Sequence, residues 1–266
     1  MEAFGAWTLE SLIAVGGLGE VWRANIPGTP AAALKRIHTH LARNEEILGQ
    51  FALEQQLVTA LPRHPNVIGA YAAGDVDGRL FLAMQLAPGE DLRRILAKAA
   101  EAKRPTALAR TRTIRIVAQA CDAVAHLHAH GYAHGDINPG NLVLDEASDH
   151  VTLVDLGVAR RLDSAPGAVR GTHAYMAPEQ VRGETWTTAT DVFALGVVLW
   201  ELASGVRLFH RGPSWLSLAA VVEAPVPPLD DRELDAIAQA ALHKDPAQRL
   251  SSARELAARL SDLITS

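Results

Sequence analysis

The chain changes its character at Pro88-Gly89. Before this point the apolar residues form short runs separated by turn residues, which is typical of strands. After it, long stretches rich in alanine and leucine follow a helical period. This order predicts a small, mainly β lobe followed by a larger helical lobe within one domain, residues 1–266. We place the small lobe at about residues 1–86, the joint at about 84–89 and the helical lobe at about 90–266.

The elements expected in each lobe follow from the spacing of apolar residues and from glycine and proline breaks. The first lobe is predicted to hold a single helix, which ends at Pro62, and strands at 7–14, 20–26, 31–37, 67–73 and 80–86. The second lobe is predicted to hold helices at 91–103, 110–129, 190–203, 231–242 and 252–263. An irregular stretch, 134–187, carries most of the unusual residues.

Composition excludes several classes of protein. Cys121 is the only cysteine, so a disulfide framework or a cysteine-rich zinc module is excluded and a reducing cytoplasm is expected. The net charge of −5 gives no indication of a nucleic-acid partner. The longest apolar run, 192–200, is much shorter than the ~20 residues of a membrane-spanning helix. We therefore expect a cytoplasmic protein with no membrane span.

Glycines lie between the first two long strands, at Gly16, Gly17 and Gly19. Glycine lets a backbone approach a phosphate group without a clash from a side chain. The simpler alternative is a glycine-rich hairpin without a ligand.

A lysine stands inside an apolar strand. Lys35 follows Ala33 and Leu34, and Glu54 lies 19 residues further on the expected helix. An ammonium group that is even partly buried needs a partner, so an ion pair between strand and helix is one interpretation. A solvated surface pair is the alternative.

Two polar residues flank a predicted hairpin between 142 and 154. Asn141 lies just before its first strand, and Asp155 sits at the end of its second strand. Carboxylate and amide oxygens that converge suit Mg²⁺, which prefers oxygen ligands and substrate phosphates.

The order and spacing of these motifs resemble the eukaryotic-type protein kinases, and most closely their bacterial serine/threonine branch. The similarity extends from about Trp7 to Leu260. It implies the α+β bilobal kinase fold, with a small antiparallel sheet and one helix in the first lobe. The matching segments are 14–21, Lys35, Glu54, 134–141, 155–157, 171–179, 191–196 and 244–249.

The resemblance implies a serine/threonine protein kinase that transfers the γ-phosphoryl group of Mg·ATP to a protein hydroxyl. The implied catalytic residues are Asp136 as the base, Lys35, Glu54 and Asn138. The implied metal ligands are Asn141 and Asp155. The implied nucleotide-binding residues are Gly16, Gly17, Gly19, Val21, Ala33, Lys35, Met84, Gln85, Ala87, Asp91 and Val143. A buried ion pair between Glu179 and Arg249 is also implied.

One departure from the family pattern concerns regulation. Gly135 replaces the usual arginine that grips a phosphorylated activation loop. The segment 155–179 offers only Ser164, Thr172 and Tyr175 as phosphate acceptors. We expect activity that does not require phosphorylation of this loop, and regulation by a cytoplasmic partner.

A second departure concerns the reaction. Asn138 stands where serine/threonine kinases usually place a lysine against the transferred phosphate. Losing one such donor typically costs ~10²–10³ in rate, so slow transfer is expected. Two alternatives remain open. One is a nucleotide-binding pseudokinase that acts as a scaffold. The other is a small-molecule phosphotransferase, because residues 134–141 also resemble the catalytic loop of such enzymes.

Overall fold

The computed structural model describes residues 1–102, 108–162 and 171–265. The chain divides into two compact units. The first contains Met1–Pro88 together with Asp155–Gly157, and the second contains Gly89–Val154 and Val158–Ser266. Each unit is described by itself below. In the described parts of the chain, no helix is long and apolar enough to cross a membrane.

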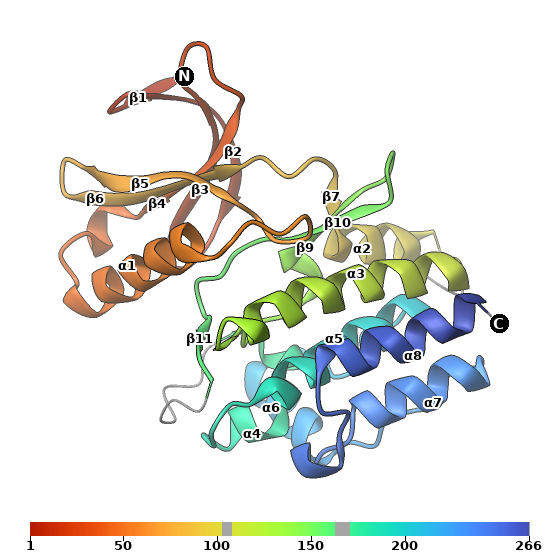
Figure 1. Cartoon of the computed structure of the whole chain (residues 1–266). Coiled ribbons are helices and arrows are strands. Elements are labelled where there is room, and N and C mark those ends of the chain that lie inside the picture. The colour runs from red at the N-terminus through yellow and green to blue at the C-terminus, as the bar shows by residue number, and fades with distance from the viewer. Residues whose placement is uncertain (103–107, 163–170, 266) are drawn as a thin grey trace. The chain divides into compact units, whose positions relative to one another are not determined.

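The first unit is built on a six-stranded antiparallel sheet with the strand order β1-β2-β3-β4-β6-β5 (Figure 1). Strand β5 begins three residues later than expected, because a turn closed by the Val67 N–H and the His64 carbonyl precedes it. Strand β1 was not expected from the sequence. The strands are β1 (Glu2–Phe4), β2 (Trp7–Val15), β3 (Gly19–Asn25), β4 (Ala32–Ile37), β5 (Ala70–Val76) and β6 (Arg79–Gln85).

Helix α1 (Glu45–Ala60) packs against strands β5 and β6. It begins where the Asn44 side chain accepts a hydrogen bond from the Ile47 N–H at 3.1 Å, a common N-cap arrangement. The Gln55 amide ties the helix to the hairpin, because it donates to the Gly74 and Phe81 carbonyls at 3.1 and 2.7 Å. A short 3-10 helix, Thr39–Leu41, precedes α1. These contacts fix the helix that carries Glu54.

The second unit is mainly helical (Figure 1). Helix α3 packs against α5 and α8, and α5 is buried along almost its whole length. The apolar run noted at 192–200 is therefore the interior helix of this unit, as expected for a helix that is hydrophobic on every side. The helices are α2 (Leu92–Glu101), α3 (Arg110–Ala129), α4 (Pro178–Val181), α5 (Thr188–Ser204), α6 (Ser214–Glu223), α7 (Arg232–Ala241) and α8 (Ala253–Thr265).

Short strands complete the second unit. Strands β7, β9 and β10 form one antiparallel sheet, and β8 pairs with β11. The hairpin predicted at 142–154 is confirmed as β9 and β10. The strands are β7 (Glu90–Asp91), β8 (Tyr132–Ala133), β9 (Leu142–Asp145), β10 (His150–Leu153) and β11 (Arg160–Arg161), and the 3-10 helices are Pro139–Asn141, His173–Tyr175 and Pro246–Gln248.

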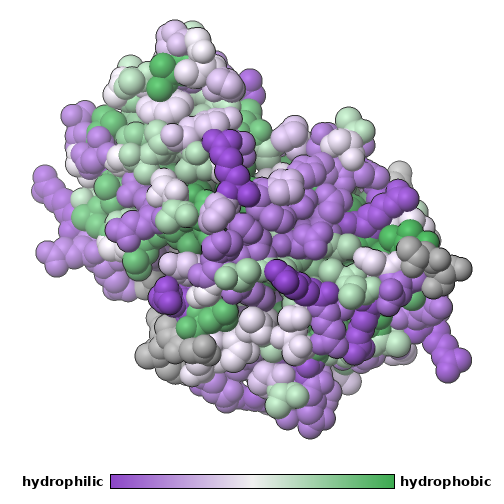
Figure 2. All heavy atoms as spheres, viewed as in Figure 1, coloured by the Kyte–Doolittle hydropathy of each residue, from purple (hydrophilic) through white to green (hydrophobic). Residues whose placement is uncertain are grey.

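The predicted α+β fold class is confirmed, and α6 is the main helix that the sequence reading missed. Its sequence has no clear apolar stripe, and Trp215 remains 68% exposed on it. The face shown in Figure 2 is mostly hydrophilic, with hydrophobic residues scattered over it. The apolar residues that define the helical period lie mainly in the core, which is why the longer helices were predictable.

The predicted ion pair between Glu179 and Arg249 is present and buried, with side chains only 2% and 0% exposed. Both guanidinium Nη atoms donate to the carboxylate, at 2.8 and 3.0 Å. The remaining donors of Arg249 reach the Ala189 and His243 carbonyls at 2.6 and 2.9 Å. The pair therefore joins the start of α4 to the segment after α7 with every charge compensated.

We predict that Arg249→Met lowers the free energy of unfolding by ~3–5 kcal/mol, because it leaves the Glu179 carboxylate buried without a partner. Urea denaturation measures the change. The matched control is Arg259→Met, which breaks the exposed pair with Glu255 and should cost less than about 1 kcal/mol. Equal losses in the two variants would contradict a structural role for the buried pair.

Candidate active site

Lys35 of β4 lies between two carboxylates in the first unit. Its Nζ donates to Glu54 Oε1 and Oε2 at 2.7 and 2.8 Å, and to Asp155 Oδ1 at 2.8 Å. Lys35 and Glu54 are 8% and 3% exposed, whereas the Asp155 side chain is 49% exposed. The interpretation as a solvated surface pair is therefore wrong, and the strand-to-helix ion pair is correct.

Burial and charge act in opposite directions on Lys35. Burial disfavours its ammonium form, but the carboxylates of Asp155 and Glu54 outweigh that effect and hold the pKa of Lys35 above its usual value. Burial also raises the pKa of the Glu54 carboxyl, and the Lys35 charge opposes the rise. Lys35 is therefore a permanently charged ammonium group, held in place on its Glu54 side by a buried partner.

Backbone geometry at Asp155 brings its carboxylate to Lys35. Asp155 has a φ of +62°, which is uncommon for a residue other than glycine, and such strain gathers at functional sites. The Gly157 N–H donates to Asp155 Oδ1 at 3.1 Å. A Cβ on Gly157 would lie only 3.0 Å from both Asp155 Oδ1 and Glu54 Oε2. A side chain at 157 would therefore make both carboxylates shift by a few tenths of an ångström, which glycine avoids.

The three glycines between β2 and β3 do not share one role. A Cβ on Gly19 would overlap the Arg36 carbonyl, so this glycine lets β3 approach β4. A Cβ on Gly17 would meet nothing within 4 Å. The turn is closed by the Gly16 N–H, which donates to the Gly19 carbonyl at 2.8 Å, and His38 Nε2 bonds to the Gly16 carbonyl at 2.9 Å. Gly16 and Gly17 therefore form the open part of the loop.

Four of the predicted residues share one face of the sheet. Val21 pairs with Lys35, and Ala33 pairs with Met84. Ala33 and Lys35 are two residues apart on β4, and paired residues of antiparallel strands point to the same face. Val21, Ala33 and Met84 therefore line the same surface as the Lys35 ammonium.

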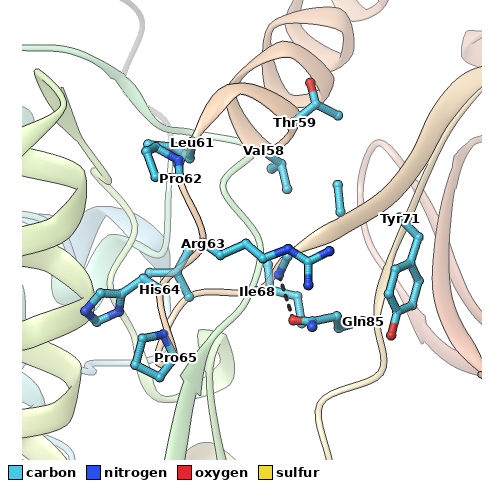
Figure 3. Close-up of a pocket in the computed structure, with 13 residues that line it drawn as sticks. Val58, Thr59, Leu61, Pro62, Arg63, His64, Pro65, Ile68, Tyr71 and Gln85 are labelled. Atoms are coloured by element: carbon cyan, nitrogen blue, oxygen red, sulfur yellow. Dashed lines mark hydrogen bonds between the residues drawn. The ribbon is translucent and has the colours of Figure 1, made fainter.

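Gln85 ends strand β6 and Ala87 follows it. The Gln85 N–H donates to the Gly69 carbonyl at 2.9 Å, and its side-chain Oε1 accepts from the Gly69 N–H at 3.1 Å. The Gln85 amide also faces a cavity of about 630 Å³ beside the end of α1, which Arg63 and Tyr71 help to line (Figure 3). Gln85 is the only predicted nucleotide-binding residue in that cavity, so the cavity is separate from the surface around Lys35.

In the second unit, Asp191 of α5 holds the loop 134–141. Its carboxylate accepts from the His134 and Gly135 N–H groups and bonds to His128 Nε2, each at 2.8 Å. Asp191 is buried, which favours the neutral acid, yet His128 and these donors hold its pKa below the usual value. Asp191, His128 and the loop all belong to the helical unit. These hydrogen bonds therefore fix the start of the loop within that unit.

Asp136 receives two donors on one oxygen. Its Oδ1 accepts from the Thr172 N–H at 2.7 Å and from Asn138 Nδ2 at 3.1 Å. The Asn141 amide donates to the Asp136 carbonyl at 2.9 Å. The structure thus brings Asp136, Asn138 and Asn141 together, and it adds Thr172 as a residue that orients Asp136.

The two predicted magnesium ligands belong to different units, Asp155 to the first and Asn141 to the second. Nδ2 of Asn141 is used on Asp136, so Oδ1 is the atom suited to a metal. No group of three or more His, Cys, Asp or Glu suited to a metal occurs among the residues that the structure describes. Each of these residues carries an oxygen donor of the kind that Mg²⁺ prefers.

Asp91 and Val143 are paired neighbours of β7 and β9. Asp91 Oδ1 accepts from the Arg94 N–H at 3.0 Å and so begins helix α2. Its carboxylate also forms an ion pair with the Arg94 side chain at 3.3 Å. Asp91 therefore has a structural task as well as its predicted nucleotide contact.

Gly135 has a φ of +75°, and a Cβ there would overlap the Trp186 ring. The Arg160 guanidinium lies over the same ring, 4.4 Å from its centre, a favourable cation–π distance. The Gly135 carbonyl accepts from Gln180 Nε2 at 2.9 Å. The space beside Gly135 is thus filled by the Trp186 ring.

Comparison with known proteins agrees with this geometry. The family model described as "Protein kinase domain" matches residues 7–260. The chain belongs to the protein kinase family. The kinase motifs expected from the sequence therefore lie in a kinase domain, and they come from both of its units.

Bacterial serine/threonine-protein kinases are among the curated relatives of this chain. Serine/threonine-protein kinase PknJ of Mycobacterium tuberculosis is 30% identical over 96% of this chain and 45% of its own length. PknA of the same species is 34% identical, over 93% and 59%. Pkn3 of Myxococcus xanthus is 32% identical, over 96% and 49%. The chain spans about half the length of the curated relatives it matches.

A solved structure is similar over nearly the whole chain. The crystal structure of the Mycobacterium tuberculosis PknI kinase domain has a TM-score of 0.76 and 27% identity. The match covers 98% of this chain and 97% of that one. The similarity supports the bilobal kinase fold assigned above.

We predict that Gly135→Ala is more destabilising than an ordinary glycine substitution. The positive φ alone should cost about 1–2 kcal/mol, and displacing the Trp186 ring should add ~1–3 kcal/mol. The matched control is Gly183→Ala, which has a φ of +71° but no atom within 4 Å of the new Cβ. Thermal or urea unfolding of both variants measures the difference, and equal losses would exclude the steric role of Trp186.

Proposed function

We propose that this kinase transfers the γ-phosphoryl group of Mg·ATP to a serine or threonine hydroxyl of a protein, with Asp136 as the base. The observation that carries the proposal is the arrangement at Asp136. Its Oδ1 accepts from the Thr172 N–H and Asn138 Nδ2, while Oδ2 has only a long contact of 3.4 Å from Asn141 Nδ2, which leaves Oδ2 as the oxygen that would accept the hydroxyl proton. The curated relatives, which are named serine/threonine-protein kinases, support the same reaction.

The residues of the first unit fit the triphosphate and adenine. The Lys35 ammonium would bind phosphate oxygens, and the open loop at Gly16 and Gly17 would lie over them. The Gln85 N–H is taken by Gly69, so the Gln85 main chain offers adenine only its carbonyl. Bound Mg²⁺, held by Asn141 and Asp155, would neutralise charge on the phosphates.

Two other functions compete with this proposal. A pseudokinase is favoured by Asn138, which lacks the charge of a lysine. A small-molecule phosphotransferase is favoured only by the loop 134–141. The buried pair Glu179–Arg249 and the clamp by Asp191 belong to the helical lobe of the protein-kinase family pattern, and they support a protein acceptor.

The wild-type kinase should label a generic protein acceptor when incubated with labelled ATP and Mg²⁺, at a slow rate. Asp136→Asn should abolish the labelling, because the amide cannot accept the hydroxyl proton. The matched control is Asp122→Asn, an exposed aspartate on α3, which should retain wild-type activity.

The same experiment separates the alternatives. Binding of ATP with no transfer by the wild type would support the pseudokinase. Label on an aminoglycoside in a parallel panel, with none on protein, would support the small-molecule phosphotransferase. Either result would overturn the proposed protein kinase activity.

We further propose that transfer does not depend on phosphorylation of the activation loop. Trp186 fills the space beside Gly135, so an arginine latch for a phosphate is absent from that position. Tyr175 is buried and its hydroxyl donates to Glu201 at 2.6 Å, which makes it a poor acceptor. Ser164 lies outside the described residues. Regulation would then come from a cytoplasmic protein partner.

Ser164→Ala should therefore leave the rate of autophosphorylation and of substrate labelling within about twofold of the wild type. The measurement is the initial rate with kinase that has first been treated with a phosphatase. A large loss in Ser164→Ala, or in the phosphatase-treated wild type, would show that the loop must be phosphorylated.

A further inference from the structure

An arginine of helix α2 contacts the catalytic loop, residues 134–141. No lysine or arginine occurs within residues 134–141. Arg93, the second residue of α2, donates from Nη2 to Asn138 Oδ1 at 2.7 Å. Both residues belong to the second unit. A guanidinium group therefore contacts the one loop position where the family pattern places a lysine.

The backbone on both sides of this contact is fixed. Asp91 pairs with Val143 of β9, and its carboxylate caps α2, which places Arg93 two residues after a strand residue. Strand β9 itself begins directly after Asn141. Helix α2 and the catalytic loop are thus both joined to strand β9. This holds the backbone of Arg93 in place relative to Asn138.

Glycine at position 140 makes room for the guanidinium. A Cβ on Gly140 would lie 2.6 Å from Arg93 Nη2 and 2.9 Å from Arg93 Cζ. It would also lie 3.1 Å from Asn138 Oδ1. A side chain at 140 would push the Arg93 head group aside, so glycine at this position leaves room for the contact.

Arg93 determines which way the Asn138 amide faces. Asn138 Oδ1 accepts from Arg93 and from the Gly140 N–H at 2.9 Å, while Nδ2 donates to the carbonyl and Oδ1 of Asp136. The reversed amide would put Nδ2 against the guanidinium and Oδ1 against the Asp136 carboxylate, both of which repel. A charged donor also makes the stronger hydrogen bond.

The charge of Arg93 lies on the side of the loop next to Thr172. Arg93 and Thr172 both line a cavity of about 290 Å³ in the second unit, together with Ala174 and Arg207. The Thr172 N–H is the second donor to Asp136. Arg93 is linked to the Asp136 carboxylate through the Asn138 amide, which accepts from Arg93 at Oδ1 and donates to Asp136 from Nδ2. Phosphoryl transfer needs charge stabilisation in this part of the site.

We propose that Arg93 is the positioning residue of this catalytic loop: it fixes the Asn138 amide on Asp136 and supplies the positive charge that the missing lysine would provide. The inference rests on the proposed phosphoryl transfer. It predicts that Arg93 is needed only while residue 138 is asparagine, which a double-mutant cycle tests.

Arg93→Ala should lower kcat roughly ten- to a hundredfold, as loss of a residue that orients a catalytic group does, with the KM for ATP unchanged. Arg93→Lys should restore part of kcat, since it keeps the charge without the planar fork. The matched control is Lys98→Ala, which removes a cation from the same helix whose partner is Glu90, and should have wild-type rates.

The decisive comparison uses Asn138→Lys. In that background Arg93→Ala should change kcat by about twofold or less, because the new lysine supplies the charge. An equal loss of kcat in both backgrounds would overturn the proposal. So would a rise in the KM for the acceptor with unchanged kcat, which would make Arg93 a substrate contact instead.

A second measurement tests the contact without any phosphoryl transfer. In ¹⁵N spectra, Arg93→Ala and Gly140→Ala should both shift the two Nδ2 proton signals of Asn138, and Lys98→Ala should not. Unshifted signals in both variants would overturn the proposal even if the enzyme is active. Shifted signals in a protein that transfers no phosphate would instead overturn the proposed function and retain the positioning role.

Discussion

The helical unit depends on one buried carboxylate. Asp191 lies within the interior helix α5, and there it accepts the backbone N–H groups of His134 and Gly135 and bonds to His128. A buried carboxylate is unfavourable unless donors surround it, so the loop cannot leave Asp191 without a large desolvation cost. The start of the loop that carries Asp136 is therefore held through the main chain of His134 and Gly135.

The first unit uses a buried charge in the same way. Lys35 and Glu54 neutralise each other between strand β4 and helix α1, where both side chains are buried. Lys35 also bonds the carboxylate of Asp155, whose side chain is half exposed to solvent. In each unit a buried carboxylate holds a candidate catalytic group. Glu54 holds Lys35 in the first unit, and Asp191 holds the loop that carries Asp136 in the second.

The sequence predicted what short-range patterns encode. Helix α3 was predicted at its observed bounds, and the hairpin of β9 and β10 was predicted because turn residues separate two apolar runs. Lys35 and Glu54 were paired correctly because an isolated lysine in an apolar strand needs an anion. Strand β1 and helix α6 were missed, since neither has a clear period. The orientation of Asp136 by Thr172 was also missed, because that contact joins residues 36 positions apart.

Both departures from the family pattern are filled by side chains from distant positions. The Trp186 ring fills the space beside Gly135, and the Arg160 guanidinium lies over that ring. Asn138 receives the guanidinium of Arg93, which precedes it by 45 residues. A glycine and a neutral amide look like losses when the loop is read alone. In three dimensions the Trp186 ring fills the space beside Gly135, and the Arg93 guanidinium brings a positive charge to Asn138. A catalytic loop must therefore be judged together with the side chains packed against it, since those side chains determine its shape and its charge.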